Sequence, residues 1–335
     1  MKAVLIIMLS LYCMLPLHAQ TSRFRLMEYN VENLFDCEDD SLKNDDEFLP
    51  DALRKWNYGK YRAKLERLMK VIVAVGEEQV PDLVALCEVE NERVLRDLTL
   101  YTPLKVLGYR FVMTDSSDER GIDVALLYQL GRFRLLSQRN IHVSLPGERP
   151  TRDIMHISGK IMTGDTLDVF VVHFPSRAGG ENTTRPYRIH VAKELKCQYD
   201  SVFAARKNPQ IVVTGDFNDF PESMSISEIL GASYPSGTVF PHKLYNVVAG
   251  CKPGTYRYQG VWGIFDHILV SGTLLDTKNK FHTSAQHAEI VTFPFLLEKD
   301  TKYGGLKPFR TYLGPRYKGG YSDHLPVRVD FFFTD

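Results

Sequence analysis

Asp216 and Asn218 are the residues whose types and spacing first indicate chemistry. They follow a short apolar run, Ile211 to Val213, which predicts a buried strand that ends near Gly215. Because residues two apart in an extended segment point to the same face, we expect the carboxylate and the amide to lie together. Such a pair can hold a water molecule beside a phosphate oxygen. The alternative is an Asx-turn that closes the strand, and this stretch alone supports both interpretations equally.

Other polar residues also stand at the end of, or inside, apolar strand-like segments. These residues are Asn30, Glu88, His173, Asp266, His267, Asp323 and His324. Apolar neighbours predict burial, and buried polar groups need partners. The strand ends of one sheet share a rim, so one polar site at that rim explains these positions better than unrelated turn and capping roles. We expect His267 to point away from the site, because it neighbours Asp266 on one strand.

The elements that must position these residues are mostly strands, with helices between some of them. Hydrophobic periodicity predicts helices over 58–76, 91–98 and 185–206. It predicts strands over 24–30, 83–87, 110–113, 123–128, 133–137, 154–162, 166–173, 211–213, 262–270 and 327–333. We expect 133–137 to pair with 123–128, and 163–165 to join a strand pair. The pattern indicates one α/β domain of layered sheets, without a glycine-rich phosphate loop.

Composition limits the classes of function. The 335-residue chain carries 41 basic and 41 acidic residues, so no global positive field attracts a polyanion. Residues 1–20 have a short basic start, an apolar core and a small-residue end, which predicts a secretory signal peptide and a mature domain over 21–335. We therefore expect an exported protein, periplasmic or secreted, that is a monomer and does not insert stably into a membrane.

The segment 36–51 is strongly acidic, with eight carboxylates and one lysine. A calcium loop is one interpretation of this composition. The segment has no glycine and its acidic residues are irregularly spaced, so a solvated surface loop is the favoured one.

The motifs resemble a known family. They are Tyr29-Asn30-Val31, Cys87-Glu88-Val89, His173, Gly215-Asp216-Phe217-Asn218, Phe265-Asp266-His267 and Ser322-Asp323-His324-Leu325-Pro326. This order is similar to that of the endonuclease/exonuclease/phosphatase superfamily, the DNase I-like group. One departure is Cys87, which stands where the family often has a glutamine. The resemblance implies a four-layer sandwich, with two central, mostly antiparallel β-sheets flanked by helices, that cleaves phosphoesters with Mg²⁺ or Mn²⁺.

The resemblance also implies a metal site. The resemblance implies that Glu88 is the main metal ligand, with Asn30 and Asp323 near the same cation. Oxygen ligands of this kind suit a hard divalent ion that keeps several waters.

Catalytic roles follow from the same resemblance. His324 is expected to meet the scissile phosphate, oriented by Asp266. Asp216 is expected to position the attacking water, and Asn218 to bind a non-bridging oxygen. His173 resembles the second active-site histidine of the DNase I branch. Asp123 stands where that branch has a carboxylate partner for it.

Two arginines are candidates for substrate contact. Arg177 follows His173 in a polar loop, and Arg310 lies in a segment, 300–323, with five basic residues and interleaved tyrosines. Basic and aromatic residues together suit a phosphate backbone and stacked bases, although an ordinary solvated loop has the same composition.

The sequence therefore predicts an exported, metal-dependent phosphodiesterase, foremost a nuclease acting on DNA or RNA. One alternative is a lipid or inositol phosphate phosphoesterase, and another is a non-catalytic binding module on the same fold. No long apolar hairpin is present of the kind that would favour a sphingomyelinase.

Overall fold

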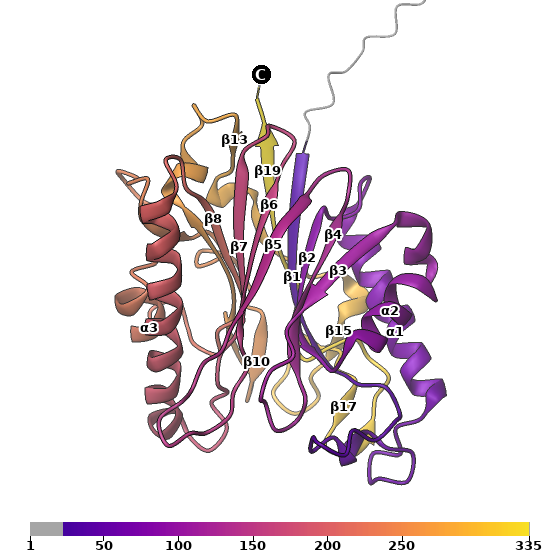
Figure 1. Cartoon of the computed structure of the whole chain (residues 1–335). Helices are drawn as coiled ribbons and strands as arrows, with labels where there is room; N and C mark the ends of the chain where they lie inside the picture. The colour runs from indigo at the N-terminus through magenta and orange to yellow at the C-terminus, as the bar shows by residue number, and fades with distance from the viewer. Residues whose placement is uncertain (1–22, 335) are drawn as a thin grey trace, which may run out of the picture.

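Two β-sheets lie face to face between helical layers in the computed structural model, which describes residues 23–334 (Figure 1). The first sheet contains β1 (Arg23–Leu34), β2 (Leu83–Val89), β3 (Tyr109–Met113), β4 (Asp123–Gln129), β13 (Phe281–His282), β14 (Ala288–Ile290) and β19 (Val327–Phe333). Its strand order is β13-β19-β1-β2-β4-β3, with β14 also paired to β19.

The second sheet has the order β5-β6-β7-β8-β12-β9. Its strands are β5 (Arg134–Ile141), β6 (Ile154–Lys160), β7 (Thr166–His173), β8 (Gln210–Asp216), β9 (Leu244–Asn246) and β12 (Asp266–Ser271). Three small hairpins complete the strands: β10 (Tyr256–Tyr258) with β11 (Val261–Gly263), β15 (Leu297–Lys299) with β16 (Leu306–Pro308), and β17 (Tyr312–Leu313) with β18 (Arg316–Tyr317).

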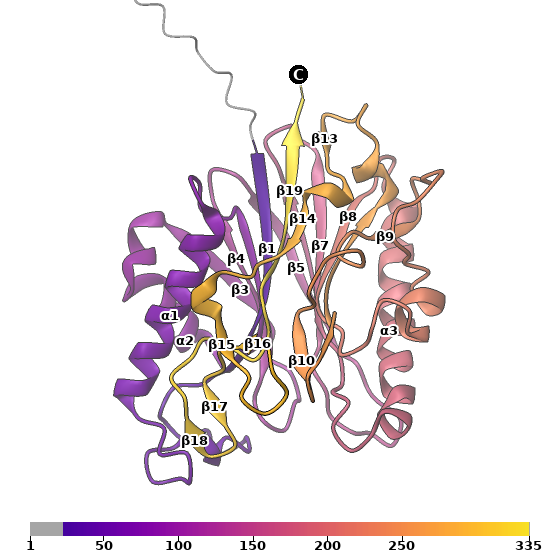
Figure 2. The same cartoon turned by 180° about the vertical axis from the view of Figure 1, so that it is seen from behind.

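The long helices form the two outer layers. α1 (Tyr58–Gly76) and α2 (Glu92–Leu100) cover the first sheet, and α3 (Glu181–Ala205) covers the second, as both views show (Figures 1 and 2). Short helical turns are η1 (Asp46–Phe48), η2 (Pro103–Leu107), η3 (Ser225–Ile229), η4 (Gly272–Leu275), η5 (Ala285–His287) and η6 (Pro294–Leu296). The predicted α/β four-layer sandwich with mostly antiparallel sheets is confirmed.

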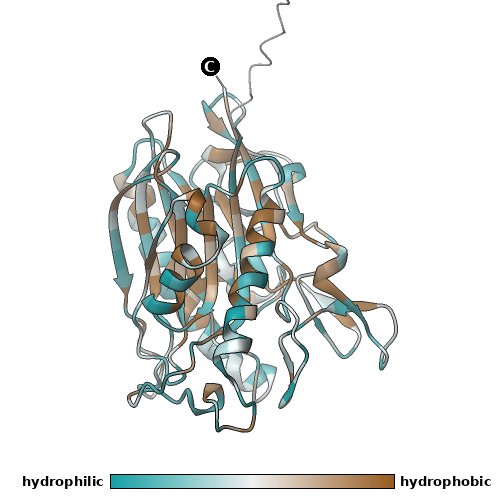
Figure 3. Ribbon diagram, turned by 90° about the vertical axis from the view of Figure 1, so that its right-hand side faces the viewer, coloured by the Kyte–Doolittle hydropathy of each residue, from teal (hydrophilic) through white to brown (hydrophobic). Residues whose placement is uncertain are grey.

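Alternation along β7 shows why the layers form. Val169 and Val171 pack into the core between the sheets, whereas Phe170 and Val172 pack beneath α3. A strand buried on both faces reads as a continuous apolar run, and its burial supplies the main driving force for layering. In Figure 3 the central strands are largely brown, while the helices alternate between teal and brown.

Strand directions create one functional rim. β1 runs parallel to β2, and β7 runs parallel to β8, so four strands end at the same edge. β12 is antiparallel to β8 and starts there, with Asp266 opposite Asp216. β19 is antiparallel to β1, and its first residue Val327 lies opposite Glu28. The residues that end or begin these strands therefore meet at one edge, the lower one in Figure 1.

Two expectations about strands are wrong. The segment 133–137 does not pair with 123–128; it belongs to β5, which pairs with β6 in the other sheet. Phe133 directly precedes β5, and its ring fills the space over Gly159 of β6, where a Cβ would lie 2.1 Å from Cζ. The segment 262–270 is also interrupted. Its chain bends where Thr255 Oγ1 accepts the amides of Phe265 and Asp266.

The N-terminal prediction lies outside the described residues, so the signal peptide stays a prediction. None of the helices within residues 23–334 is long and apolar enough to cross a bilayer. The four cysteines of this part of the chain are free thiols, and Cys87 is buried as its apolar neighbours predict.

Candidate active site

The Asp216 carboxylate, at the end of β8, is the centre of the rim. Its Oδ2 accepts hydrogen bonds from the side-chain amides of Asn30, at 3.0 Å, and Asn218, at 3.2 Å. Nε2 of His173 lies 3.6 Å from the same oxygen, and Nε2 of His324 lies 3.9 Å from it. The sequence-predicted residues of four separate segments therefore converge on one atom.

The Asx-turn interpretation of the Asp216–Asn218 spacing is confirmed, and the other oxygen of the same carboxylate faces the other polar residues of the rim. Asp216 Oδ1 accepts the backbone N–H of Asn218 at 2.8 Å, which is an Asx-turn, while Oδ2 faces the cluster. Gly215 has a φ of +142°, and a Cβ there would lie 1.9 Å from the Val172 carbonyl oxygen of β7. Only glycine lets β8 approach β7 closely enough to set Asp216 beside His173.

His324 is oriented by Asp266, as predicted. Its Nδ1 lies 3.0 and 2.8 Å from the two carboxylate oxygens of Asp266, which is fully buried. The backbone N–H of His324 is fixed by Ser322 Oγ, and the Tyr256 ring packs 4.9 Å from the imidazole. Burial alone would lower the pKa of His324, but Asp266 and Asp216 raise it well above its usual value, which favours the imidazolium.

Glu88 is aimed into the rim by a β-bulge. The register of β2 shifts between Cys87 and Val89, and Glu88 adopts a φ of +66°. Its Oε2 accepts the backbone N–H of Asn33 at 2.9 Å, which leaves Oε1 facing the cluster, 4.0 Å from His173 Nε2. Non-glycine residues with positive φ number eight in the described chain, and four of them, Glu32, Asn33, Glu88 and Asn218, lie at this rim. Such strain concentrates where a site demands it.

Asp323 is held by a partly buried ion network. Arg310 bonds Asp323 Oδ2 at 2.9 Å and Glu32 Oε1 at 3.1 Å, so the arginine predicted to contact substrate has two partners within the protein. Lys64 of α1 is 1% exposed, and its Nζ donates to Thr311 Oγ1 and to the Tyr321 carbonyl, both at 2.6 Å. Burial lowers the pKa of Lys64 to about 8 and raises that of Glu32 to about 7.

His173 is held from behind by Arg152. The Arg152 guanidinium donates to the backbone carbonyls of His173 and Phe174 and pairs with Asp118. Burial, followed by the charge of Arg152, lowers the pKa of His173 well below its usual value, which favours a neutral imidazole.

Asp123 is not brought to His173. Its carboxylate accepts Thr114 Oγ1 at 2.5 Å and the backbone N–H of Ser116 at 3.0 Å. These local bonds at the start of β4 hold Asp123 in place, and the carboxylates nearest His173 Nε2 are those of Asp216 and Glu88.

Arg177 is also occupied by internal partners. It forms ion pairs with Asp219 at 2.9 Å and Glu181 at 2.6 Å, and it stacks over the Phe220 ring. His267 bonds Asn246 and the Asp219 carbonyl, away from the site, as predicted.

Sequence reasoning missed the fully buried Glu28 of β1. Its Oε1 lies 3.8 Å from Cys87 Sγ, and its Oε2 has no partner in the described structure. Burial, followed by Asp266 and Asp216, raises the pKa of Glu28 well above its usual value. The signal was available, because Glu28 stands two positions before Asn30 and so shares its face of the strand.

Two groups of side chains have the chemistry of a metal site. Asp216, Asp266 and His324 offer atoms within 4.8 Å of one another, but these residues already bond each other or the neighbouring amides. Asn30, Glu88 and Asp323 also carry oxygens of the kind that suits a hard divalent cation. Each is already bonded in this structure: Asn30 Oδ1 and Glu88 Oε2 accept backbone N–H groups, and Asp323 Oδ2 bonds Arg310.

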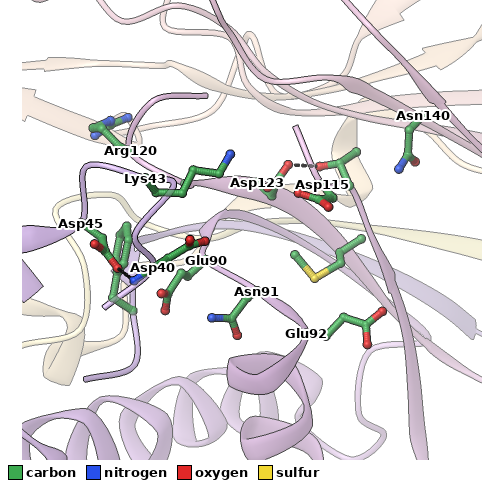
Figure 4. A pocket seen from close by; sticks show the side chains of 14 residues that line it. Asp40, Lys43, Asp45, Glu90, Asn91, Glu92, Asp115, Arg120, Asp123 and Asn140 are labelled. Atoms are coloured by element: carbon green, nitrogen blue, oxygen red, sulfur yellow. Dashed lines mark hydrogen bonds between the residues drawn. The ribbon is translucent and has the colours of Figure 1, made fainter. Parts of the chain in front are cut away.

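A pocket of about 360 Å³ adjoins this rim (Figure 4). Two lining residues show that it lies beside the rim. Glu90 is two residues after Glu88 in the chain, and the charge of Arg120 helps lower the pKa of His173. Its carboxylates are Asp40, Asp45, Glu90, Glu92, Asp115 and Asp123, against the cations Lys43 and Arg120. Burial raises the pKa of Glu90 to about 8. This side of the site is acidic, unlike a groove that binds a polyanion.

The sequence matches the endonuclease/exonuclease/phosphatase family over residues 25–332, and the chain belongs to that family. No curated protein matches it significantly.

Solved structures share the fold. A mannosyl-6-phosphatase from Bacteroides thetaiotaomicron is 17% identical, with 92% of this chain and 100% of that chain covered and a TM-score of 0.56. The human nocturnin catalytic domain with bound sulfate is 18% identical, with 93% and 95% covered and a TM-score of 0.55. TDP2 from D. rerio, complexed with a single-strand DNA product, is 17% identical, with 92% and 99% covered and a TM-score of 0.54.

Proposed function

We propose that this protein is an exported phosphodiesterase that depends on Mg²⁺ or Mn²⁺, with DNA or RNA as the first substrates to test. The observation that supports it is the convergence on Asp216 Oδ2, where two imidazoles and two amides from separate segments lie within 3.9 Å. A site with acid–base groups, amide donors and carboxylates suits hydrolysis of a phosphate ester.

Each side chain has a role in this proposal. Because Nδ1 of His324 is bonded to Asp266, Nε2 is the nitrogen left to meet the phosphate or to move a proton. Asp216 orients the attacking water. The amide of Asn218, which donates to Asp216 Oδ2 and to the Phe174 carbonyl in this structure, would exchange one of these bonds for a non-bridging oxygen of the substrate. Neutral His173 completes the cluster on the other side.

The oxygens of Asn30, Glu88 and Asp323 would hold the cation, with Glu88 as the main ligand. The ion supplies charge neutralisation at the phosphate and a lower pKa for bound water. Arg310 keeps Asp323 in place, which makes it a positioning residue in this proposal.

The nucleic-acid part of the proposal has mixed support. Relatives of this fold include a TDP2 structure with a DNA product. However, three of the five basic residues of 300–323 pair with carboxylates of the protein: Lys307 and Lys318 with Glu298, and Arg310 with Asp323 and Glu32. Their charge is therefore partly neutralised before a polyanion arrives.

The acidic pocket favours a second candidate, hydrolysis of the phosphate ester of a small polyhydroxylated compound such as an inositol or sugar phosphate. Carboxylates and the amides of Asn91 and Asn140 in the pocket are acceptors for hydroxyl groups, and its volume suits a small molecule better than a duplex. A fold relative is described as a mannosyl-6-phosphatase.

One assay separates the candidates. The purified mature protein is incubated with plasmid DNA, single-stranded DNA, RNA, inositol phosphates and sugar phosphates, with Mg²⁺, Mn²⁺ or a chelator. We expect chelator-sensitive cleavage of a nucleic acid, which Glu88→Gln abolishes. Turnover of the small esters alone would replace the first candidate with the second. Failure with every substrate and both metals would favour a binding module.

A further inference from the structure

The acidic segment 36–51 contains a second cluster of carboxylates, apart from the catalytic rim. Asp39, Asp45 and Asp46 each offer an oxygen, and these oxygens lie within 4.8 Å of one another. Within residues 23–334 none of the three forms an ion pair. The lysine of the segment, Lys43, is turned elsewhere, because its Nζ donates to the carbonyls of Ser116 at 2.7 Å and Asp118 at 3.2 Å.

The burial of the Asp45 carboxylate also points to a bound cation, independently of the clustering. Although most of the segment is exposed, Asp45 is 2% exposed. Its Oδ2 accepts the backbone N–H of Asp40 at 3.1 Å, but its Oδ1 has no hydrogen-bond partner in the described structure. Burying a carboxylate oxygen beside two other carboxylates, with no donor, costs free energy that the loop does not otherwise recover. A cation between the three side chains removes this cost.

We propose that Asp39, Asp45 and Asp46 form a binding site for a divalent cation, with Ca²⁺ preferred. The donors are all oxygens, and the two exposed ligands leave room for water to complete a shell of six to eight ligands. Mg²⁺ demands a closer, octahedral arrangement, which an irregular loop supplies less well. The absence of a glycine excludes an EF-hand geometry, but it does not prevent a site assembled from a folded loop.

The site would fix one wall of the acidic pocket. Asp45 lines that pocket, and η1 begins at the next residue. Phe48 of η1 stacks on Phe35, with ring centroids 4.1 Å apart, and meets Trp56 edge-on at 6.2 Å. A cation at Asp45 therefore connects the pocket wall to the end of β1. This inference is independent of the reaction proposed above.

Calcium binding measured by titration calorimetry tests the proposal. The protein carries Glu88→Gln, which weakens the proposed catalytic cation site, and the Asp45→Asn and Asp46→Asn variants then show whether the remaining binding occurs at this cluster. We expect one Ca²⁺ to bind, and Asp45→Asn to weaken it by about tenfold or more, since it removes a ligand charge while keeping the shape. Asp46→Asn, at an exposed position, should weaken binding as well and guards against a folding defect of the buried variant. Asp51→Asn, an exposed acid of the same segment outside the cluster, is the matched control.

Terbium provides a second readout. The chain has two tryptophans, and Trp56 packs on η1, so Tb³⁺ at this site should show luminescence sensitised by Trp56 that Ca²⁺ displaces. We expect Trp56→Phe and Asp45→Asn to remove the signal and Asp51→Asn to keep it. No calcium binding in the Glu88→Gln protein, or equal affinity in the Asp45→Asn, Asp46→Asn and Asp51→Asn variants, would overturn the proposal.

Discussion

The two ends of β7 bury charge in opposite ways. Asp168, near the start of the strand, is fully buried, and its carboxylate bonds Ser158 Oγ, His156 Nε2 at 3.1 Å and the Arg206 guanidinium at 3.0 Å. Burial alone would raise the pKa of Asp168, but the bonds from His156 and Arg206 lower it to about 2. At this end the buried carboxylate has partners for its charge.

The other end of β7 has more buried carboxylates than cations. His173 ends the strand beside Asp216, and Asp266 and Glu28 lie near the same carboxylate. Burial raises the pKa of Asp216 to about 7, even though His324 opposes the shift. Glu28 Oε2 and His173 Nδ1 have no partner in residues 23–334. Compensated charge stabilises the fold, whereas this uncompensated end is where we propose that a cation and a substrate bind.

The largest expected effect is on turnover at the uncompensated end. Against the substrate that the assay identifies, His324→Ala and Glu88→Gln should each reduce kcat by about 10³-fold or more, because they remove an acid–base group and the main metal ligand. Thermal unfolding should stay close to that of the parent protein. His142→Ala, at an exposed histidine paired only with Asp153, is the matched control. Near-parental activity in either folded variant would remove these roles.

The sequence predicted the converging residues because they obey a rule about strands. His173 and Asp216 close two parallel strands, and Asp266 opens the antiparallel neighbour. Glu88 is the last residue but one of β2, and Asn30 lies in the parallel strand β1, just before its register shifts. Apolar residues that recur along a strand, and turn residues that end it, are local signals in the sequence. The strand ends could therefore be located without knowing the fold. α1, expected over 58–76, spans Tyr58–Gly76.

What the sequence did not predict depends on partners distant along the chain. Arg310 looked available for substrate, but it is held by Glu32 of the other end of the chain. The buried Lys64 reads as an ordinary polar position of an amphipathic helix, and its partners, Thr311 and Tyr321, carry no shared spacing with it. β5 belongs to the second sheet, and the packing of Phe133 over Gly159 next to it is a contact that periodicity cannot show.

A smaller effect is expected on stability at the compensated end. Asp168→Asn should lower the free energy of unfolding at neutral pH by about 2 kcal/mol, because the depressed pKa of Asp168 corresponds to that much preferential binding of the charged form. Denaturation in urea measures it, and activity at a permissive temperature should persist.

The control for Asp168→Asn is the dependence of its stability difference from the parent on pH. The pKa of Asp168 is about 2 in the folded protein against an ordinary value of 3.8, so its contribution is complete above pH 3.8 and is lost as the pH falls through 2. The stability difference between Asp168→Asn and the parent should therefore shrink across that range. A difference that stays constant down to the lowest pH at which both proteins fold would show that packing, and not charge compensation, accounts for the loss.

The smallest effect, and the sharpest test of the comparison, is expected for Asp216→Asn in metal-free protein. The folded pKa of Asp216 is raised to about 7, so its ionisation costs stability as the pH rises from the ordinary value of 3.8 through 7. The amide cannot ionise, and it keeps an acceptor for Asn30 and Asn218. At pH 8 we therefore expect metal-free Asp216→Asn to be no less stable in urea than the metal-free parent, while turnover of the variant with Mg²⁺ or Mn²⁺ is lost. If this variant instead loses as much stability as Asp168→Asn, the two ends of β7 do not differ in charge compensation. The cluster around Asp216 would then stabilise the fold as Asp168 does.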